Sequence, residues 1–314
     1  MKKVLTLSLA ALMLGALAIP AYAQDKKEEA RSVLLKDTYK AMERRTEKSE
    51  EKNETNVKPK DQEIVLQNEV KTSSEVKVAD ILEVNADGKP TSIRIRWTEG
   101  TETTETTSAG QPPADPVEED TEMKGVSILY TWNAEKKAYT SKLEEGDAEV
   151  SGVKKELSKS DPLFNAFIPG REVKVGESWE PKEEDIKKMM GEDENIKLTK
   201  VSATCKAEEI VKEEGVELLR VSLEISMTGE LQNENLGNPS LEATRSGSFF
   251  WNIKEGRFVR LEMENKGEFE AEVNHPQAGK MTLTVTVDGD ETKTETVGKV
   301  EDEKKDDDSD DDMK

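Results

Sequence analysis

The chain has 314 residues, of which 33% are hydrophobic and 36% are charged, and its formal net charge is −22 at pH 7. This acidic balance argues against nucleic acid or an anionic membrane surface as a partner, because both are recognised by clustered lysine and arginine. The low hydrophobic fraction predicts a thin core, with part of the chain outside it.

Residues 1–23 have the pattern of a secretory signal peptide. Lys2 and Lys3 precede an apolar run that ends at Ile19, and small residues lead to Ala23, after which the chain turns polar. The apolar run is too short to cross a bilayer comfortably. We therefore expect cleavage after Ala23 and a soluble periplasmic or extracellular protein. Because no cysteine follows the expected junction, no stable membrane anchor is predicted.

Residues 24–60 are highly charged. Val33 to Leu35, Tyr39 and Met42 are spaced as on one side of a helix, which predicts a solvated amphipathic helix near 27–48, with a linker as the alternative. From residue 61 to 299 the pattern changes to alternating and β-branched, first at 63–66 and then at 76–82. This range is predicted to be an antiparallel β domain.

The first hairpin is predicted at 81–97, with turn residues between Asn85 and Pro90. Its second strand places Ile93, Ile95 and Trp97 on one face and arginines on the other, as expected of a sheet with one buried side. Residues 98–122 follow as an acidic insert, which we predict to be disordered because it has little to bury.

Later elements are predicted from the same signals. A hairpin at 126–143 precedes a short helix at 151–167, which Pro162 interrupts or ends, and a second helix at 181–190. Further turns are expected at 213–215, 254–256 and 274–279, and a closing strand at 281–287. Residues 300–314, with nine acids between 301 and 312, are predicted to be a solvated, disordered tail.

Two hairpins are similar in sequence. Trp132-Asn133, followed by Tyr139, matches Trp251-Asn252, followed by Phe258, at the same offset. Each is preceded by another strand pair, at 78–97 and 198–225, so two similar sheet halves are one interpretation. The other is that many hairpins have this aromatic pattern.

Two segments carry a family resemblance. Pro169 followed by Val173 to Trp179, which reads VKVGESW, and the later strand from Gly247 to Phe258 resemble secreted bacterial proteins of unknown function that share a "P…V.VG.SW" segment and a "G…F…GR" strand. The resemblance covers about 160–273. It also implies a loose similarity to the open β-barrels of periplasmic lipoprotein carriers. In the first segment, glycine permits a tight turn, after which Trp179 can seal an edge of the sheet or, alternatively, stack on a ligand.

These patterns together predict a mainly β fold, all-β or α+β. We expect a curved antiparallel sheet or unclosed barrel with one or two short helices packed on it.

The sequence nominates no catalytic, cofactor-binding or metal-binding residue. His275, which is the one histidine, lies in a predicted turn. Cys205 is the one cysteine and is predicted to be buried in a strand, with an intermolecular disulfide as the alternative. The frame from Glu83 to Gly88 begins like a calcium loop, but Arg94 occupies the position of the bidentate glutamate, and Asp288 to Asp290 are assigned to a turn. Met189-Met190 are assigned to helix packing.

Absent catalytic groups and the resemblance favour a non-enzymatic protein that binds an apolar ligand or a protein partner on the concave side of its sheet. A structural or envelope-assembly module with acidic solubilising segments is the second hypothesis. The third is an unrecognised hydrolase, which would need a cleft with clustered carboxylates of raised pKa.

Overall fold

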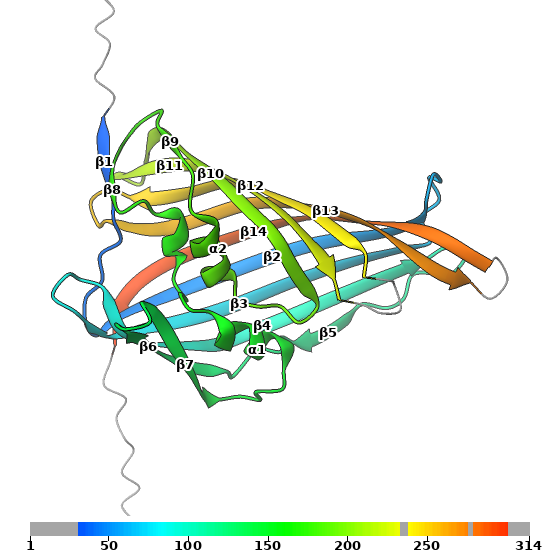
Figure 1. Cartoon of the computed structure of the whole chain (residues 1–314), viewed down its shortest axis with the longest axis horizontal. Coiled ribbons are helices and arrows are strands. Elements are labelled where there is room, and N and C mark those ends of the chain that lie inside the picture. Colours follow the sequence, from blue (N-terminus) through cyan, green and yellow to red (C-terminus); the bar gives the residue numbers. More distant parts are fainter. Residues whose placement is uncertain (1–30, 233–237, 276–278, 301–314) are drawn as a thin grey trace, which may run out of the picture.

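A computed structural model describes residues 31–232, 238–275 and 279–300. The predicted signal peptide and the tail from residue 301 lie outside this range. Within it, twelve strands form one curved, unclosed antiparallel sheet, with two short helices on its concave side (Figure 1). The order across the sheet is β7-β6-β4-β3-β2-β14-β13-β12-β11-β10-β9, and β5 pairs with β4. No helix in the described part is both long and apolar enough to cross a membrane.

The first half of the chain builds one side of the sheet. Its strands are β2 (Glu43–Pro59), β3 (Gln67–Val84), β4 (Pro90–Ser108), β5 (Val117–Asp120), β6 (Ser127–Asn133) and β7 (Ala138–Glu145). The second half adds β9 (Ser178–Trp179), β10 (Ile196–Glu213), β11 (Val216–Leu231), β12 (Ser240–Asn252), β13 (Arg257–His275) and β14 (Gly279–Lys299). The first and last long strands, β2 and β14, pair at the centre. A separate two-stranded sheet joins β1 (Ser32–Leu35) to β8 (Arg171–Lys174).

Three helical segments connect the two halves. They are α1 (Ser151–Ser158), the 3-10 turn η1 (Phe164–Phe167) and α2 (Glu183–Met190). The predicted helices are confirmed, with Pro162 lying in the break between α1 and η1. Ile186 is fully buried on α2, while Met189 and Met190 pack against the core more loosely.

Two hydrophobic cores lie on the concave face. One joins β10 to β13 with α2, η1, β1 and β8, and the other joins β3, β4 and β6 with α1. Ile93, Ile95 and Trp97 are buried in the second, which confirms the predicted alternation. The central strands β2 and β14 separate the two cores, and where these strands pass under the helical segments their concave side chains, such as Glu47, Glu291 and Lys293, are charged.

The helix predicted near 27–48 is wrong. The described part of this segment, from residue 31, forms β1 and the start of β2, and β2 runs through the middle of the sheet. The charges that suggested a solvated helix pair across strands instead, as when Arg44 Nε donates to Asp80 Oδ1 at 2.6 Å. Between two neighbours, a strand has its backbone hydrogen bonds satisfied without needing an apolar side chain at every second position.

The disordered insert predicted at 98–122 is also wrong. β4 continues to Ser108 in register with β3, and β5 then pairs with it. Threonine has a high strand propensity, and cross-strand contacts such as Lys71 Nζ to Glu102 Oε1, at 2.8 Å, replace hydrophobic burial.

Two smaller assignments are corrected. Residues 63–66 form a loop, with Ile64 exposed, rather than the first strand of the domain. Asp288 to Asp290 lie within β14, not in a turn, and the strand extends beyond the predicted 281–287. Gly289 is needed there because a Cβ atom would clash with the side chain of Asn53 on β2.

The predicted hairpins are confirmed by the pairing of their strands, although residues 276–278 of the turn predicted at 274–279 lie outside the described residues. In the β3–β4 turn, Asn85 Oδ1 accepts hydrogen bonds from the backbone N–H groups of Asp87 and Lys89. The two Trp–Asn hairpins occupy equivalent places in the meanders β3–β4–β6–β7 and β10–β11–β12–β13, with Trp132 opposite Tyr139 and Trp251 opposite Phe258.

The Gly176–Trp179 segment closes one edge of the sheet, as predicted. Gly176 has a φ of 91°, and Trp179 pairs with Cys205 of β10 while its Nε1 donates to the Phe167 carbonyl at 3.1 Å. Cys205 is a free, fully buried thiol, and burial raises its pKa to about 12. This confirms its predicted role as a small core residue.

Candidate functional site

A cavity of about 620 Å³ lies between the concave face of the sheet and the helical segments. Its lining comes from α1, α2 and η1 on one side and from β2, β3, β4, β11, β12, β13 and β14 on the other. This volume is within the range of about 300–1,000 Å³ that small-molecule sites have. The concave side of the sheet therefore contains a cavity large enough for a small molecule.

One side of the cavity is apolar. η1 and α2 contribute aromatic and methionine side chains, and the strands opposite contribute aliphatic ones that belong to the same hydrophobic core. We call this surface the apolar wall; its members are Phe164, Phe167, Met189, Met190, Leu223, Ile225, Met227, Phe258, Leu261 and Met263. Because several of these side chains are only partly covered by the core, they leave hydrocarbon surface for a ligand.

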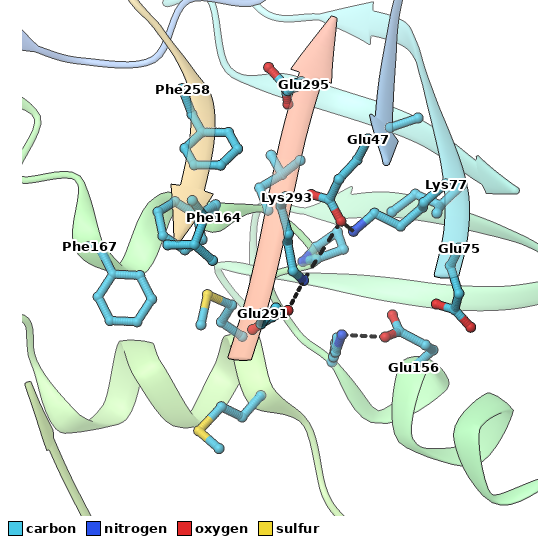
Figure 2. Close-up of a pocket in the computed structure, with 18 of the residues that line it drawn as sticks. Glu47, Glu75, Lys77, Glu156, Phe164, Phe167, Phe258, Glu291, Lys293 and Glu295 are labelled. Carbon is cyan, nitrogen blue, oxygen red and sulfur yellow. Dashed lines mark hydrogen bonds and ion pairs between the residues drawn. The ribbon is translucent and has the colours of Figure 1, made fainter. Parts of the chain in front are cut away.

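The other side is a chain of alternating charges that crosses the central strands. Lys77 Nζ lies 3.0 Å from Glu47 Oε1, and Lys293 Nζ lies 3.8 Å from the same oxygen and 3.0 Å from Glu291 Oε1. Glu291 also pairs with Arg245. We call these five residues the charged floor. Figure 2 shows Glu47, Lys77 and Lys293 converging across the cavity from Phe164 and Phe167.

In the charged floor, neighbouring side chains of opposite charge stabilise one another against the cost of burial. Burial alone would raise the pKa of Glu47, but Lys77 and Lys293 outweigh it and lower that pKa to about 2. Burial likewise opposes the charge of Lys293, yet Glu47 and Glu291 raise its pKa above the usual range. Glu47 and Lys293 are therefore ionised at neutral pH, and neither is a candidate general acid or base.

A second charged group lies at one end of the floor. Arg45 is buried, donates to both carboxylate oxygens of Asp37 and stacks 4.0 Å above the Tyr39 ring. Glu295 Oε1 is 3.6 Å from Arg45 Nη1 and has no hydrogen-bond partner among the described residues. Burial raises the pKa of Glu295 to about 7 even though Arg45 acts to lower it.

Two further carboxylates face the cavity near α1. Glu75 of β3 is half-buried, and burial raises its pKa. Glu156 of α1 forms an ion pair with Lys159. Figure 2 shows Glu75 and Glu156 on the side of the cavity away from the phenylalanines. The cavity thus combines an apolar wall with a densely charged opposite side.

Of the residues that the sequence analysis considered for chemistry, Met189 and Met190 line the cavity, and the others lie elsewhere. His275 is the last residue of β13 and lies opposite Gly279 of β14. Asn85 stabilises the β3–β4 turn, and Arg94 of β4 pairs with Glu144 of β7. Among the described residues, no group of three or more His, Cys, Asp or Glu is arranged to hold a metal ion. The charged floor was missed because β2 was assigned to a helix. The signal for it is the run of charged residues at every second position of β14, namely 291, 293 and 295.

Comparisons with known proteins identify no family for this chain and only weak structural similarities. No family model and no curated protein matches the chain. A lipovitellin structure, titled for its lipid–protein interactions, aligns with 84% of this chain at 8% identity and a TM-score of 0.45, and the chain spans 26% of that protein. Outer membrane protein OprG from Pseudomonas aeruginosa aligns with 82% of this chain and 98% of its own, at 8% identity and a TM-score of 0.20. At this level of similarity neither neighbour's function is carried over.

Proposed function

We propose that this chain is an exported, non-enzymatic binding protein whose cavity holds a small amphipathic ligand. The observation that carries the proposal is the pairing of an apolar wall with a charged floor in one cavity of about 620 Å³. The predicted signal peptide supports export, and the loose similarity to open-barrel carriers is consistent with a ligand on the concave side.

The composition of the cavity supports this ligand class. Each methylene that leaves water for the apolar wall contributes about 0.8 kcal/mol to binding. A ligand that was apolar throughout would cover Lys77, Lys293 and Arg245 without giving them any polar contact, which is costly for ionised groups. A ligand with one hydrocarbon part and one polar head group avoids that cost. A zwitterionic head can meet both signs of the floor.

The proposal is tested by binding of lysophosphatidylcholine with a 12-carbon chain, measured by calorimetry on the full mature chain. Met227 is half-buried in the wall, so Met227→Trp fills the cavity and should weaken binding at least about tenfold. Ser226 is the next residue on the same strand and points to the opposite, exposed face. Ser226→Trp is therefore the matched control and should bind as the unmodified protein does.

Native mass spectrometry of protein purified from its own source provides a second test. An added mass that disappears after extraction with organic solvent is the expected result. Unloaded protein in repeated preparations, together with no calorimetric signal for the 12-carbon probe, would overturn the proposal.

A further inference from the structure

The concave face of the sheet continues past the cavity as an apolar surface. Cross-strand register places Ala243 of β12 opposite Met227 of the apolar wall, and Leu241 opposite Phe269 of β13. Phe269 in turn lies opposite Val285 of β14, which lies opposite Val57 of β2. We call Leu241, Ala243, Phe269, Val285 and Val57 the distal strip. Because no register shift interrupts these pairings, all five share the face of the cavity.

The distal strip is apolar but is not part of a core. Its five side chains are only partly buried, and within the described residues none of them belongs to or packs against either hydrophobic core. Figure 1 shows the far ends of β13 and β14 reaching well beyond the helices that cover the cavity. The opposite face of the same strands carries exposed charges such as Glu268 and Asp288, so the apolar character is confined to the concave side.

We propose that the distal strip holds a hydrocarbon chain that extends out of the cavity, so that the ligand is a long-chain lipid. The inference rests on the proposed function and names its ligand class. Its support is that the strip is continuous with the cavity. Counted from Met227 on β11, which lines the cavity, the path to Val57 on β2 crosses four strand spacings. With strands about 4.8 Å apart, this gives a path of about 19 Å for a chain.

A hydrocarbon chain also fits the chemistry of the strip better than a peptide. The backbone of β13 and β14 is already paired on both sides along the strip, so this surface offers no free N–H or C=O groups to a bound strand. An aliphatic chain makes no such demand and gains free energy only from the apolar area that it covers.

The test compares lysophosphatidylcholines with 12-carbon and 18-carbon chains, both added below their micellar concentrations to the full mature protein. Val285→Lys places a charge in the strip, and Thr286→Lys places the same charge one residue away on the opposite face. The unmodified protein should bind the longer chain at least about tenfold more tightly, since each buried methylene is worth about fourfold in affinity.

Val285→Lys is expected to abolish this preference while leaving affinity for the 12-carbon probe unchanged, and Thr286→Lys should alter neither. If Val285→Lys retains the full preference, the strip is not used, although the cavity proposal stands on its 12-carbon affinity. If light scattering instead shows a dimer that Val285→Lys dissociates, the strip is an interface between copies and the lipid assignment is wrong. If neither chain binds the unmodified protein, both proposals fail.

Discussion

Glu295 is the acid of the cavity whose surroundings least favour its charge. Its side chain is 12% exposed, and its Oε1 atom lies 3.6 Å and 3.7 Å from the guanidinium nitrogens of Arg45 and Arg257 without a hydrogen bond from either. Both arginines form closer ion pairs with other acids, Arg45 with Asp37 and Arg257 with Glu255. Burial therefore dominates and raises the pKa of Glu295 from 4.5 to about 7.

A raised pKa makes this residue a source of pH-dependent stability. Because the folded state binds the Glu295 proton more tightly than the unfolded state, the contribution is fully present below about pH 4.5 and is lost as pH rises through about 7. Glu295→Gln removes the titration. Between about pH 4 and pH 8.5, the free energy of unfolding of the variant should gain about 3 kcal/mol relative to the unmodified protein.

Urea denaturation at a series of pH values measures this difference. Glu264 is an exposed acid on the neighbouring strand β13, so Glu264→Gln provides a control that should show no such dependence. A difference between Glu295→Gln and the unmodified protein that stays constant with pH would show that Glu295 ionises normally in the fold.

At the scale of elements, the two-residue strand β9 covers an edge of the sheet and links it to a helical segment. β10 would otherwise present its outer side as an open edge, and Trp179 covers part of it while bonding to the carbonyl of Phe167 in η1. One side chain thus links the edge of the sheet to a helical segment of the apolar wall.

Trp179→Phe tests this link. Phenylalanine retains most of the packing but leaves the carbonyl of the buried Phe167 without its donor, so the free energy of unfolding should fall by about 1 kcal/mol. Trp179→Ala loses the packing as well and should cost about 3 kcal/mol or more. Urea denaturation compares the two, and equal stability of Trp179→Phe and the unmodified protein would show that the hydrogen bond contributes nothing.

The elements that could be predicted are those with local signals. Hairpins with Asn, Asp and Gly turns, and the helices at 151–167 and 181–190, were predictable because turn chemistry and periodicity lie within a few residues. β2 could not be predicted in the same way, because its charged side chains are satisfied by partners such as Asp80 and Lys77 on the next strand. The pairing of β2 with β14, which joins segments more than 200 residues apart, has no local signal at all.

The candidate site shares this difficulty. Its apolar wall contains Met189 and Met190, which the sequence assigns to helix packing, and nothing local separates a packed methionine from one that faces a cavity. The charged floor exists only once Glu47, Lys77 and Lys293 are brought together from three strands. A concave ligand site could therefore be predicted in outline but not residue by residue.

For the molecule as a whole, the two cores divide the sheet into regions of unequal stability. Both cores lie under the helical segments, whereas the distal ends of the long strands, which carry the half-buried distal strip, belong to neither core. β13 passes through both regions: Leu261 and Met263 are core residues, while beyond Phe269 its pairing with β12 has ended and only β14 remains beside it.

Hydrogen exchange along β13 should show this gradient within one strand. Amides at 260–265 open only with the core, so they should exchange at least about tenfold more slowly than amides at 270–274, which open when a two-stranded ribbon frays. Mass spectrometry of overlapping peptides measures both segments in the same sample, so pH and temperature are identical for the two. Equal protection along β13 in ligand-free protein would contradict the gradient and would mean that the distal strip is already covered in solution. Slower exchange at 270–274 on adding the 18-carbon probe, with 260–265 unchanged, is the result expected of a chain that lies across the strip.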